Sequence, residues 1–259
     1  MGTDHTSLPP LGDLASAAYA AIPGALKEKL LSVAVPTLSA VLFKEGFHTR
    51  FLPGVKPLNV NAARFCGAAW TIRAIPIRED LRNAIASGEM PSRNRRTFDA
   101  APAGAVVVCG TGCHPQVALM GDIMSTSLMT RGVAAAVLDT GVSDAHFISS
   151  MPFPVVCAGS APVSSFAQIM IIDQDTPIGF NGVAVFPGDI IVGDANGAVC
   201  IPRHLAGHIA DLAIEQEKLE EYILERIKAG APIEGTYPPS AAVLSEYQAW
   251  KSATAAPSV

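Results

Sequence analysis

The fold is decided by two apolar runs, Ala105-Val106-Val107-Val108-Cys109 and Ala134-Ala135-Ala136-Val137-Leu138-Asp139. Each run is short and continuous, and the first is rich in β-branched residues, which is typical of a strand buried on both faces of a parallel sheet. Gly110-Thr111-Gly112 predicts a turn after the first strand, and a helix with a break near Gly121 should follow it. Strand, helix and strand make a βαβ unit, so the two strands should be parallel with a right-handed crossover.

The sequence on either side predicts further helices and strands. Thr37 is the expected N-cap of a helix that runs to Lys44 and stops at Gly46. Thr140-Gly141 is expected to end the second strand of the βαβ unit. The other expected elements are helices over 14–21, 25–33 and 204–228, strands over 65–75, 155–158 and 169–173, and a hairpin over 190–201.

The chain divides into three parts by composition. Residues 1–12 are predicted to be a flexible tail, residues 13–235 a single α/β domain, and residues 236–259 a C-terminal tail with one short helix. Within the domain, residues 78–104 are polar and rich in arginine, which indicates an insertion made of one helix and a long loop. Long loops in compact domains are often functional, but a solvated surface insertion explains the same pattern.

Composition excludes several classes of protein. Hydrophobic residues make up 49% of the 259 residues, so the chain can bury a large core, and no apolar run is long enough to span a bilayer. The net charge of −5 argues against a nucleic-acid binder, which needs a basic surface. The absence of a secretory signal and an odd number of cysteines, five, predict a cytoplasmic protein with reduced thiols.

Three familiar ligand patterns are weak. The glycines at 110 and 112 suggest a dinucleotide-binding turn, but Pro115 stands where the third glycine is required. Cys109, Cys113 and His114 lack a fourth zinc ligand at a recognisable spacing. His204 and His208 share a helix face with Asp211, a spacing that can hold a metal but that is common on solvated helices.

A stronger candidate site lies in the βαβ unit. Gly121-Asp122 stands at a helix start, where the backbone N–H groups of Ile123 and Met124 would attract a carboxylate. Asp144 follows the next strand, and its carboxylate could hold a divalent cation. Asp122 could orient a water or carry a proton. A helix cap and a turn-forming aspartate explain the same residues without any ligand.

These residues resemble a known family. The stretch from Gly121-Asp122-Ile123-Met124 to Asp139-Thr140-Gly141-Val142-Ser143-Asp144 is similar to the 4-hydroxy-4-methyl-2-oxoglutarate aldolases and the related regulator-of-ribonuclease-activity A proteins. The resemblance continues through 35–39, 65–73 and the glycine-rich hairpin region 182–197. It implies an α/β fold, a β/β/α sandwich around a small β-barrel of the swivelling-domain type, with helices at both ends.

The family's hallmark is an acidic residue, twenty intervening residues and then Arg-Asp. Here the acid is Asp122 and the final aspartate is Asp144, with residues 123–142 between them and Ser143 in the arginine position. The resemblance implies that Asp144 holds Mg²⁺ or Mn²⁺ and that Gly121 to Met124 bind the pyruvyl end of a 2-oxo acid. The family arginine neutralises an enolate, whereas a serine supplies one neutral hydrogen bond and no charge.

Three functions therefore stay open. The chain is a metal-dependent lyase in which another arginine replaces the lost one, or it performs different enolate chemistry such as hydration or isomerisation, or it is a binding protein like the ribonuclease regulators. The resemblance also implies a homotrimer or homohexamer with a small carboxylate as substrate and no membrane or nucleic-acid partner. Glu215 or Glu217 of a neighbouring subunit could complete the site. The arginines considered are Arg73, Arg78, Arg93, Arg95 and Arg96.

Overall fold

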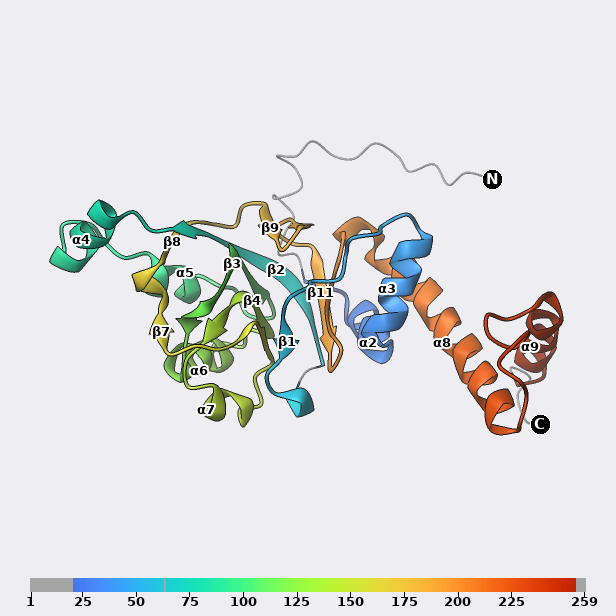
Figure 1. Ribbon diagram of the computed structural model, residues 1–259. Coiled ribbons are helices and arrows are strands. Elements are labelled where there is room, and N and C mark those ends of the chain that lie inside the picture. The colour runs from blue at the N-terminus through green and yellow to red at the C-terminus, as the bar shows by residue number, and fades with distance from the viewer. Residues whose placement is uncertain (1–20, 63, 255–259) are drawn as a thin grey trace.

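A computed structural model describes residues 21–62 and 64–254 (Figure 1). The expected tail over 1–12, and all but the last residue of the helix expected over 14–21, lie outside these residues. The described chain forms a mixed α/β fold around a ten-stranded sheet whose main path is β1-β5-β4-β3-β2-β11-β12. The strands are β1 (Lys56–Pro57), β2 (Phe65–Pro76), β3 (Val106–Met120), β4 (Ala135–Val142), β5 (Val155–Cys157), β6 (Gly159–Ser160), β7 (Val163–Ser164), β8 (Ile169–Gln174), β11 (Ile190–Asp194) and β12 (Gly197–Ile201).

The predicted parallel unit is confirmed. β3 pairs with β4 in parallel, with Val107 opposite Ala136, and β2 and β5 extend the parallel set on either side. β11 and β12 form the expected hairpin, which joins the sheet antiparallel to the first residues of β2. A separate pair, β9 (Ile178–Phe180) and β10 (Val183–Val185), lies beside β3. The sheet therefore curves toward a barrel, and the finer assignment to a swivelling-type sandwich stays a prediction.

Three apolar clusters hold the fold together. One lies between the sheet and the helices that follow β3 and β4, and includes Phe98, Leu128 and Ile148. A second fills the opposite face of the sheet, where Phe180 is fully buried. The third joins the β11–β12 hairpin to the N-terminal helices and the long C-terminal helix through residues such as Leu38. Burial of such side chains is worth about 1.5–3 kcal/mol each, which makes these clusters the main source of stability.

The helices pack in two groups on either side of the hairpin (Figure 1). The helices α2 (Gly24–Ser32), α3 (Val35–Lys44) and α8 (Ala206–Lys228) contact one another beyond β11 and β12, and α9 (Ala241–Thr254) lies at the far end of α8. The prediction that Thr37 caps α3 was wrong, because the helix begins at Val35 with Pro36 in its first turn, and Thr37 is buried inside it.

The helix expected directly after Gly110-Thr111-Gly112 does not form. β3 continues as strand to Met120, with irregular pairing to β4 beyond Cys109. Gly112 and Cys113 adopt positive φ, which bends the strand without ending it. The buried carboxylate of Asp139 accepts hydrogen bonds from the Thr111 amide (2.8 Å), the Thr111 hydroxyl (2.7 Å) and the Cys113 amide (3.0 Å). A side chain of the neighbouring strand β4 therefore pairs with the polar groups of this bend.

Several other helices and strands also differ from their predicted bounds. β4 does not end at Thr140-Gly141 but continues to Val142, because it pairs with the extended part of β3. The crossover helix is only α6 (Asp122–Thr130), and a short helix, α7 (Ala145–Ser149), follows β4. The polar segment 78–104 holds two helices, α4 (Glu79–Ser87) and α5 (Asn94–Asp99), rather than one helix and a long loop.

Two further observations concern the whole chain. None of the helices in the described ranges is both long and apolar enough to cross a membrane. All five cysteines are free, with Cys113 exposed and the other four buried. The division into a tail, one domain and a C-terminal tail stays a prediction, although the helix expected within residues 236–259 is present as α9.

Candidate active site

The two halves of the predicted motif meet at the start of α6. Gly121, the residue before this helix, lies so close to the β4–α7 turn that a Cβ there would come within 2.5 Å of Ser143 Oγ and 2.6 Å of Asp144 Oδ2. The Ser143 amide donates to the Met120 carbonyl (3.1 Å), which fixes the turn against the end of β3. The structure therefore brings Gly121, Ser143 and Asp144 together, although they are far apart in the sequence.

Asp144 occupies an unusual backbone conformation at this junction. Its φ of 56° lies in the left-handed region, which non-glycine residues adopt infrequently. The side chain is exposed, and Asp144 Oδ2 accepts a hydrogen bond from Ser143 Oγ at 2.7 Å. Backbone strain of this kind costs about 1–3 kcal/mol and is concentrated at functional sites. The conformation directs a carboxylate to the surface beside Gly121.

The first turn of α6 presents backbone donors at the same place. The Ser125 amide and hydroxyl both bond to the Gly121 carbonyl, at 3.0 and 2.8 Å, which ties down the start of the helix. The Ile123 amide, expected to face a ligand, donates instead to Asp122 Oδ1 at 2.7 Å. Asp122 thus acts as a local cap in this structure, while the role of residues 121–124 in substrate binding stays a prediction.

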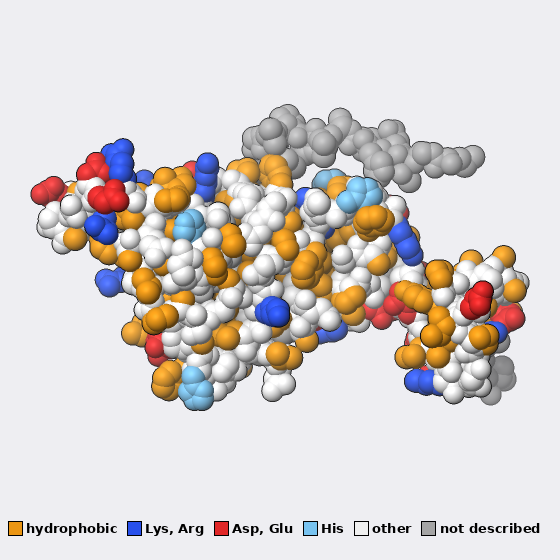
Figure 2. Space-filling model, in the orientation of Figure 1, with side chains coloured by type: hydrophobic (Ala, Val, Ile, Leu, Met, Phe, Trp, Pro, Cys, Tyr) orange, Lys and Arg blue, Asp and Glu red, His pale blue; other side chains and the backbone are white. Residues whose placement is uncertain are grey.

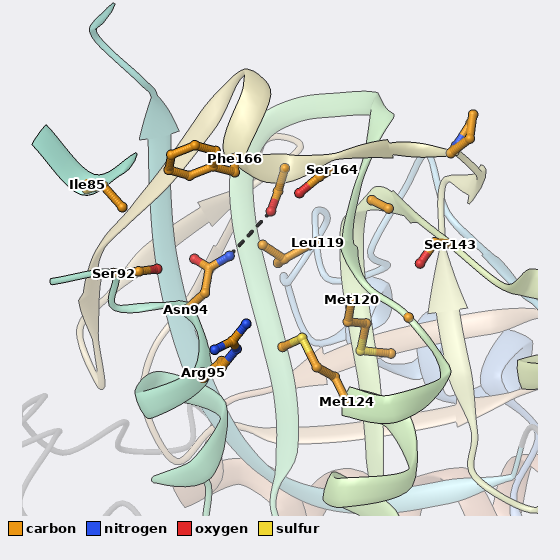
Figure 3. A pocket seen from close by; sticks show the side chains of 14 residues that line it. Ile85, Ser92, Asn94, Arg95, Leu119, Met120, Met124, Ser143, Ser164 and Phe166 are labelled. Atoms are coloured by element: carbon orange, nitrogen blue, oxygen red, sulfur yellow. Dashed lines mark hydrogen bonds between the residues drawn. The ribbon is translucent and has the colours of Figure 1, made fainter. Parts of the chain in front are cut away.

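A cleft of about 650 Å³ opens over this junction. Gly121, Met124 and Ser143 line it, as does Arg95 of α5, which Figure 3 shows on the side away from Ser143. Asn94 joins the walls, since its side-chain amide donates to Ser165 Oγ at 3.3 Å. Of the described residues that line the cleft, one is basic and none is acidic; the remaining ones are Ile85, Ser92, Ala118, Leu119, Met120, Pro162, Ser164 and Phe166. This lining suits an anion.

The five candidate arginines are separated by the structure. Arg95 lines the cleft, whereas Arg78 pairs with Asp80 (2.6 Å) and Arg93 donates to the Ile172 carbonyl (2.7 Å). Neither Arg73 nor Arg96 is among the described cleft residues. Figure 3 shows Arg95 and Ser143 on different sides of the cleft, so Arg95 approaches a ligand from the opposite wall rather than from the motif position.

The Asp144 carboxylate is the predicted position of a divalent ion. Within residues 21–62 and 64–254, no group of three or more His, Cys, Asp or Glu side chains could enclose a metal. Mg²⁺, however, keeps several waters and is commonly bound through one or two carboxylates together with substrate oxygens. The exposed carboxylate of Asp144, with the Ser143 hydroxyl beside it, fits that mode of binding.

The residues of the weaker metal patterns are buried or paired with other side chains. Burial, assisted by the nearby charge of Asp139, raises the pKa of the Cys109 thiol well above its usual value, which disfavours the thiolate that zinc needs. His208 Nε2 lies 2.8 Å from Glu45, and Asp211 pairs with Lys29 at 2.5 Å, so both side chains join α8 to the N-terminal helices.

The acidic residues considered for a shared site also have partners within the chain. Glu217 Oε1 accepts a hydrogen bond from the Ala34 amide at 2.8 Å, at the start of α3. Glu215 pairs with Lys218 and with Lys251 of α9, and these hydrogen bonds hold the pKa of its carboxyl below the usual value. A role for either residue in a second subunit stays a prediction.

Several residues of the site have no motif that reveals them. Asn94, Ser164 and Ser165 reach the cleft from the arginine-rich insertion and from the β7 region, and their polar character is ordinary for loops. Asp139 acts indirectly, because its hydrogen bonds shape the bent part of β3 that leads to Gly121. The available signal was the polar, arginine-rich composition of residues 78–104, which a solvated surface insertion explains equally well.

Comparison with known proteins decides the family. The sequence profile of the RraA-like family, described as Aldolase/RraA, matches residues 35–200. The chain belongs to the RraA-like family. Its matched region includes the junction of Gly121, Ser143 and Asp144, as well as Arg95, and it ends before α8 and α9.

Individual members of the family are distant. Protein DlpA of Legionella pneumophila is 27% identical over 183 residues, which cover 71% of this chain and 28% of that longer protein. The 4-hydroxy-4-methyl-2-oxoglutarate aldolase of Thermus thermophilus is 26% identical over 166 residues, or 64% of this chain and 91% of the relative. The Streptomyces coelicolor protein RraAS2, an unusual member of the RNase ES inhibitor RraA family, superposes with a TM-score of 0.69 at 26% identity over 79% of this chain and 98% of its own.

Proposed function

We propose that this member of the RraA-like family is a divalent-metal-dependent carbon–carbon lyase acting on a 2-oxo acid or a related carboxylate. The observation that carries the proposal is the junction at α6, where Gly121 lies against Ser143 and Asp144 at the edge of a cleft lined by a cation and neutral donors. The aldolase name of the Thermus thermophilus relative supports this class of reaction.

Different residues in and beside the cleft contact different parts of the substrate. The substrate carboxylate lies at the N-terminus of α6, where the helix dipole favours negative charge. The Ser143 hydroxyl donates one hydrogen bond to the same end of the substrate. Asp122, beside Gly121 but not among the lining residues, is the expected proton carrier: in an aldol cleavage it takes the proton of the 4-hydroxyl group, directly or through a water, as the C3–C4 bond breaks, and returns it to C3 of the enolate to give pyruvate.

Asp144 is the residue that would hold Mg²⁺ or Mn²⁺. When bound, such an ion polarises the substrate carbonyl and lowers the cost of the negative charge that develops as the bond breaks. The left-handed backbone of Asp144 and the absence of a side chain at Gly121 serve this role, because together they leave the carboxylate exposed beside the helix start.

Arg95 supplies the positive charge that Ser143 cannot. Its place on the opposite wall suits a second anionic group of the substrate or the charge that develops during the reaction. Loss of one charged donor of this kind typically lowers kcat by a factor on the order of a hundred or more. The first of the three open functions, a lyase with a relocated arginine, is therefore the one that we favour.

The proposal is tested by pyruvate release. We expect the purified protein to release pyruvate from oxaloacetate or from a 4-hydroxy-2-oxo acid in the presence of Mg²⁺, and chelation to abolish the activity. Asp144→Ala and Arg95→Met should each lower kcat/KM at least about a hundredfold. Asp211→Ala, which removes an exposed carboxylate on α8, is the matched control and should retain full activity. Magnesium-independent turnover, or equal activity in Asp144→Ala, contradicts the proposal.

Restoring the family arginine at position 143 distinguishes the candidate reactions. Ser143→Arg should reduce the natural activity if Arg95 has taken over the role of the motif arginine. If instead aldolase activity arises only in Ser143→Arg, the natural reaction is a different enolate reaction. The resemblance to RraAS2 favours one further test, since a protein with no 2-oxo acid turnover that inhibits a ribonuclease is a regulator. Assembly into trimers or hexamers and a cytoplasmic location stay predictions.

A further inference from the structure

A second cavity of about 180 Å³ opens beside the cleft. The two cavities share the lining residues Ile85, Ser92, Asn94 and Phe166, so they adjoin at these side chains. Figure 3 shows Ile85, Ser92 and Phe166 on the side of the cleft away from Ser143. We call the smaller cavity the side chamber.

The lining of the side chamber differs from that of the cleft. Its floor comes from β8, where Ile169 and Ile171 are nearly fully buried and Met170 is half-buried. Its roof comes from Ile77, which follows β2, and from Met90 of the polar insertion. Arg93, Ser92 and Asn94 also line the chamber, but its other lining residues are apolar, whereas the cleft is lined by Arg95 and several hydroxyl groups.

Helix α4 contributes Ile85 to the lining of the side chamber. α4 has no buried residue, and the charged side chains of its first turns gather at the tip of the molecule (Figure 2). Ile85, on the same helix, is only half-buried and lines both cavities. An apolar side chain that is incompletely covered beside a polar cleft gains free energy when an apolar group of a ligand covers it.

We propose that the side chamber receives an apolar group of the substrate while the carboxylate of the same molecule lies in the cleft. The inference rests on the proposed function and narrows its substrate to 2-oxo acids that carry an apolar substituent. The volume supports this, because a cavity of about 150 Å³ accommodates a benzene molecule. The shared lining supports it as well, since Asn94 borders both the cleft that Ser143 lines and the chamber that Met90 lines.

The test compares three probes by calorimetry: pyruvate, 2-oxohexanoate and phenylpyruvate, each with Mg²⁺ present. Wild type should bind 2-oxohexanoate on the order of fiftyfold more tightly than pyruvate, because each buried methylene group contributes about fourfold. The affinity for phenylpyruvate should exceed the affinity for pyruvate by at least the same factor. Equal affinities for the three acids overturn the inference.

Variants show whether the gain in affinity for the larger acids comes from the side chamber. Met90→Trp fills the chamber without touching the cleft, so it should bind pyruvate like wild type and lose the advantage of the two larger acids. Ala86→Trp, on the exposed side of α4, is the matched control and should retain the advantage. If Met90→Trp fails to fold, Met170→Trp tests the same prediction from the floor. An advantage that survives filling of the chamber also overturns the inference.

The outcomes separate this inference from the proposed function. Pyruvate binding without any gain from a larger substituent leaves the lyase proposal intact and removes the side chamber from substrate recognition. If none of the three acids binds in the presence of Mg²⁺, both proposals fail together.

Discussion

Gly121 and Asp144 show how a site can depend on the absence of a side chain. The turn that carries Asp144 approaches the start of α6 so closely that no Cβ fits between them. The atoms in the way are the ends of two side chains, Ser143 Oγ and Asp144 Oδ2, rather than backbone. A methyl group at position 121 would therefore displace the functional groups and leave the fold nearly unchanged.

Gly121→Ala tests this separation of site from stability. We expect the free energy of unfolding to change by less than about 1 kcal/mol, because the displaced side chains can rotate toward solvent. The activity should fall at least tenfold, since the Asp144 carboxylate loses its position. Chemical denaturation and the pyruvate assay on the same preparation measure both quantities. A large loss of stability, or full activity, is inconsistent with this role for Gly121.

At the scale of elements, β3 determines where the site lies. The sequence predicted its first residues, Val106 to Cys109, and its parallel pairing with β4, because a continuous β-branched run has few other interpretations. It did not predict the continuation to Met120. Glycines at 110 and 112 indicate a turn locally, and what keeps the chain extended is tertiary: the carboxylate of Asp139 on β4 satisfies the amides of Thr111 and Cys113.

Gly110 shows the same override of local preference. It allows β3 to pass β9 closely, since a Cβ at this position would come within 2.6 Å of the Gly179 carbonyl oxygen. Because that oxygen belongs to the backbone, it cannot rotate away. The glycine is therefore needed for packing between strands rather than for a turn.

Gly110→Ala should accordingly destabilise the protein by about 1–3 kcal/mol, the usual cost of overpacking. The matched control is Gly207→Ala on α8, where nothing lies within 4 Å of the added Cβ and the variant should be stabilised by up to about 1 kcal/mol. Urea denaturation of the two variants and the wild type measures the difference. Equal stability of all three proteins would show that β9 does not constrain β3.

At the scale of the whole molecule, the sequence placed Gly121-Asp122 at a helix start and Asp144 after a buried strand, and the structure brings Gly121, Ser143 and Asp144 together. The role of these residues in binding stays a prediction. Of the five candidate arginines, however, the sequence could not select Arg95. That selection depends on how α5 packs beside α6, which is a matter of tertiary contacts between distant segments.

The insertion that carries Arg95 was also the least predictable part of the chain. Its composition indicated a surface segment, yet the structure makes it one wall of the cleft and the roof of the side chamber. α4 and α5 are short and polar, and the position of α5 comes from contacts with α6 and β8 and from the hydrogen bond of Asn94 to Ser165 rather than from periodicity. The strands of the sheet and the insertion beside them are thus predictable to different degrees.

The account as a whole depends on a divalent ion at Asp144, and titration of Mn²⁺ into the purified protein by calorimetry tests this most directly. We expect one binding site per chain in the wild type, no measurable binding in Asp144→Ala, and unchanged binding in the control Asp211→Ala. Wild-type protein that does not bind Mn²⁺, or Asp144→Ala that binds it as tightly as the wild type, would contradict the account.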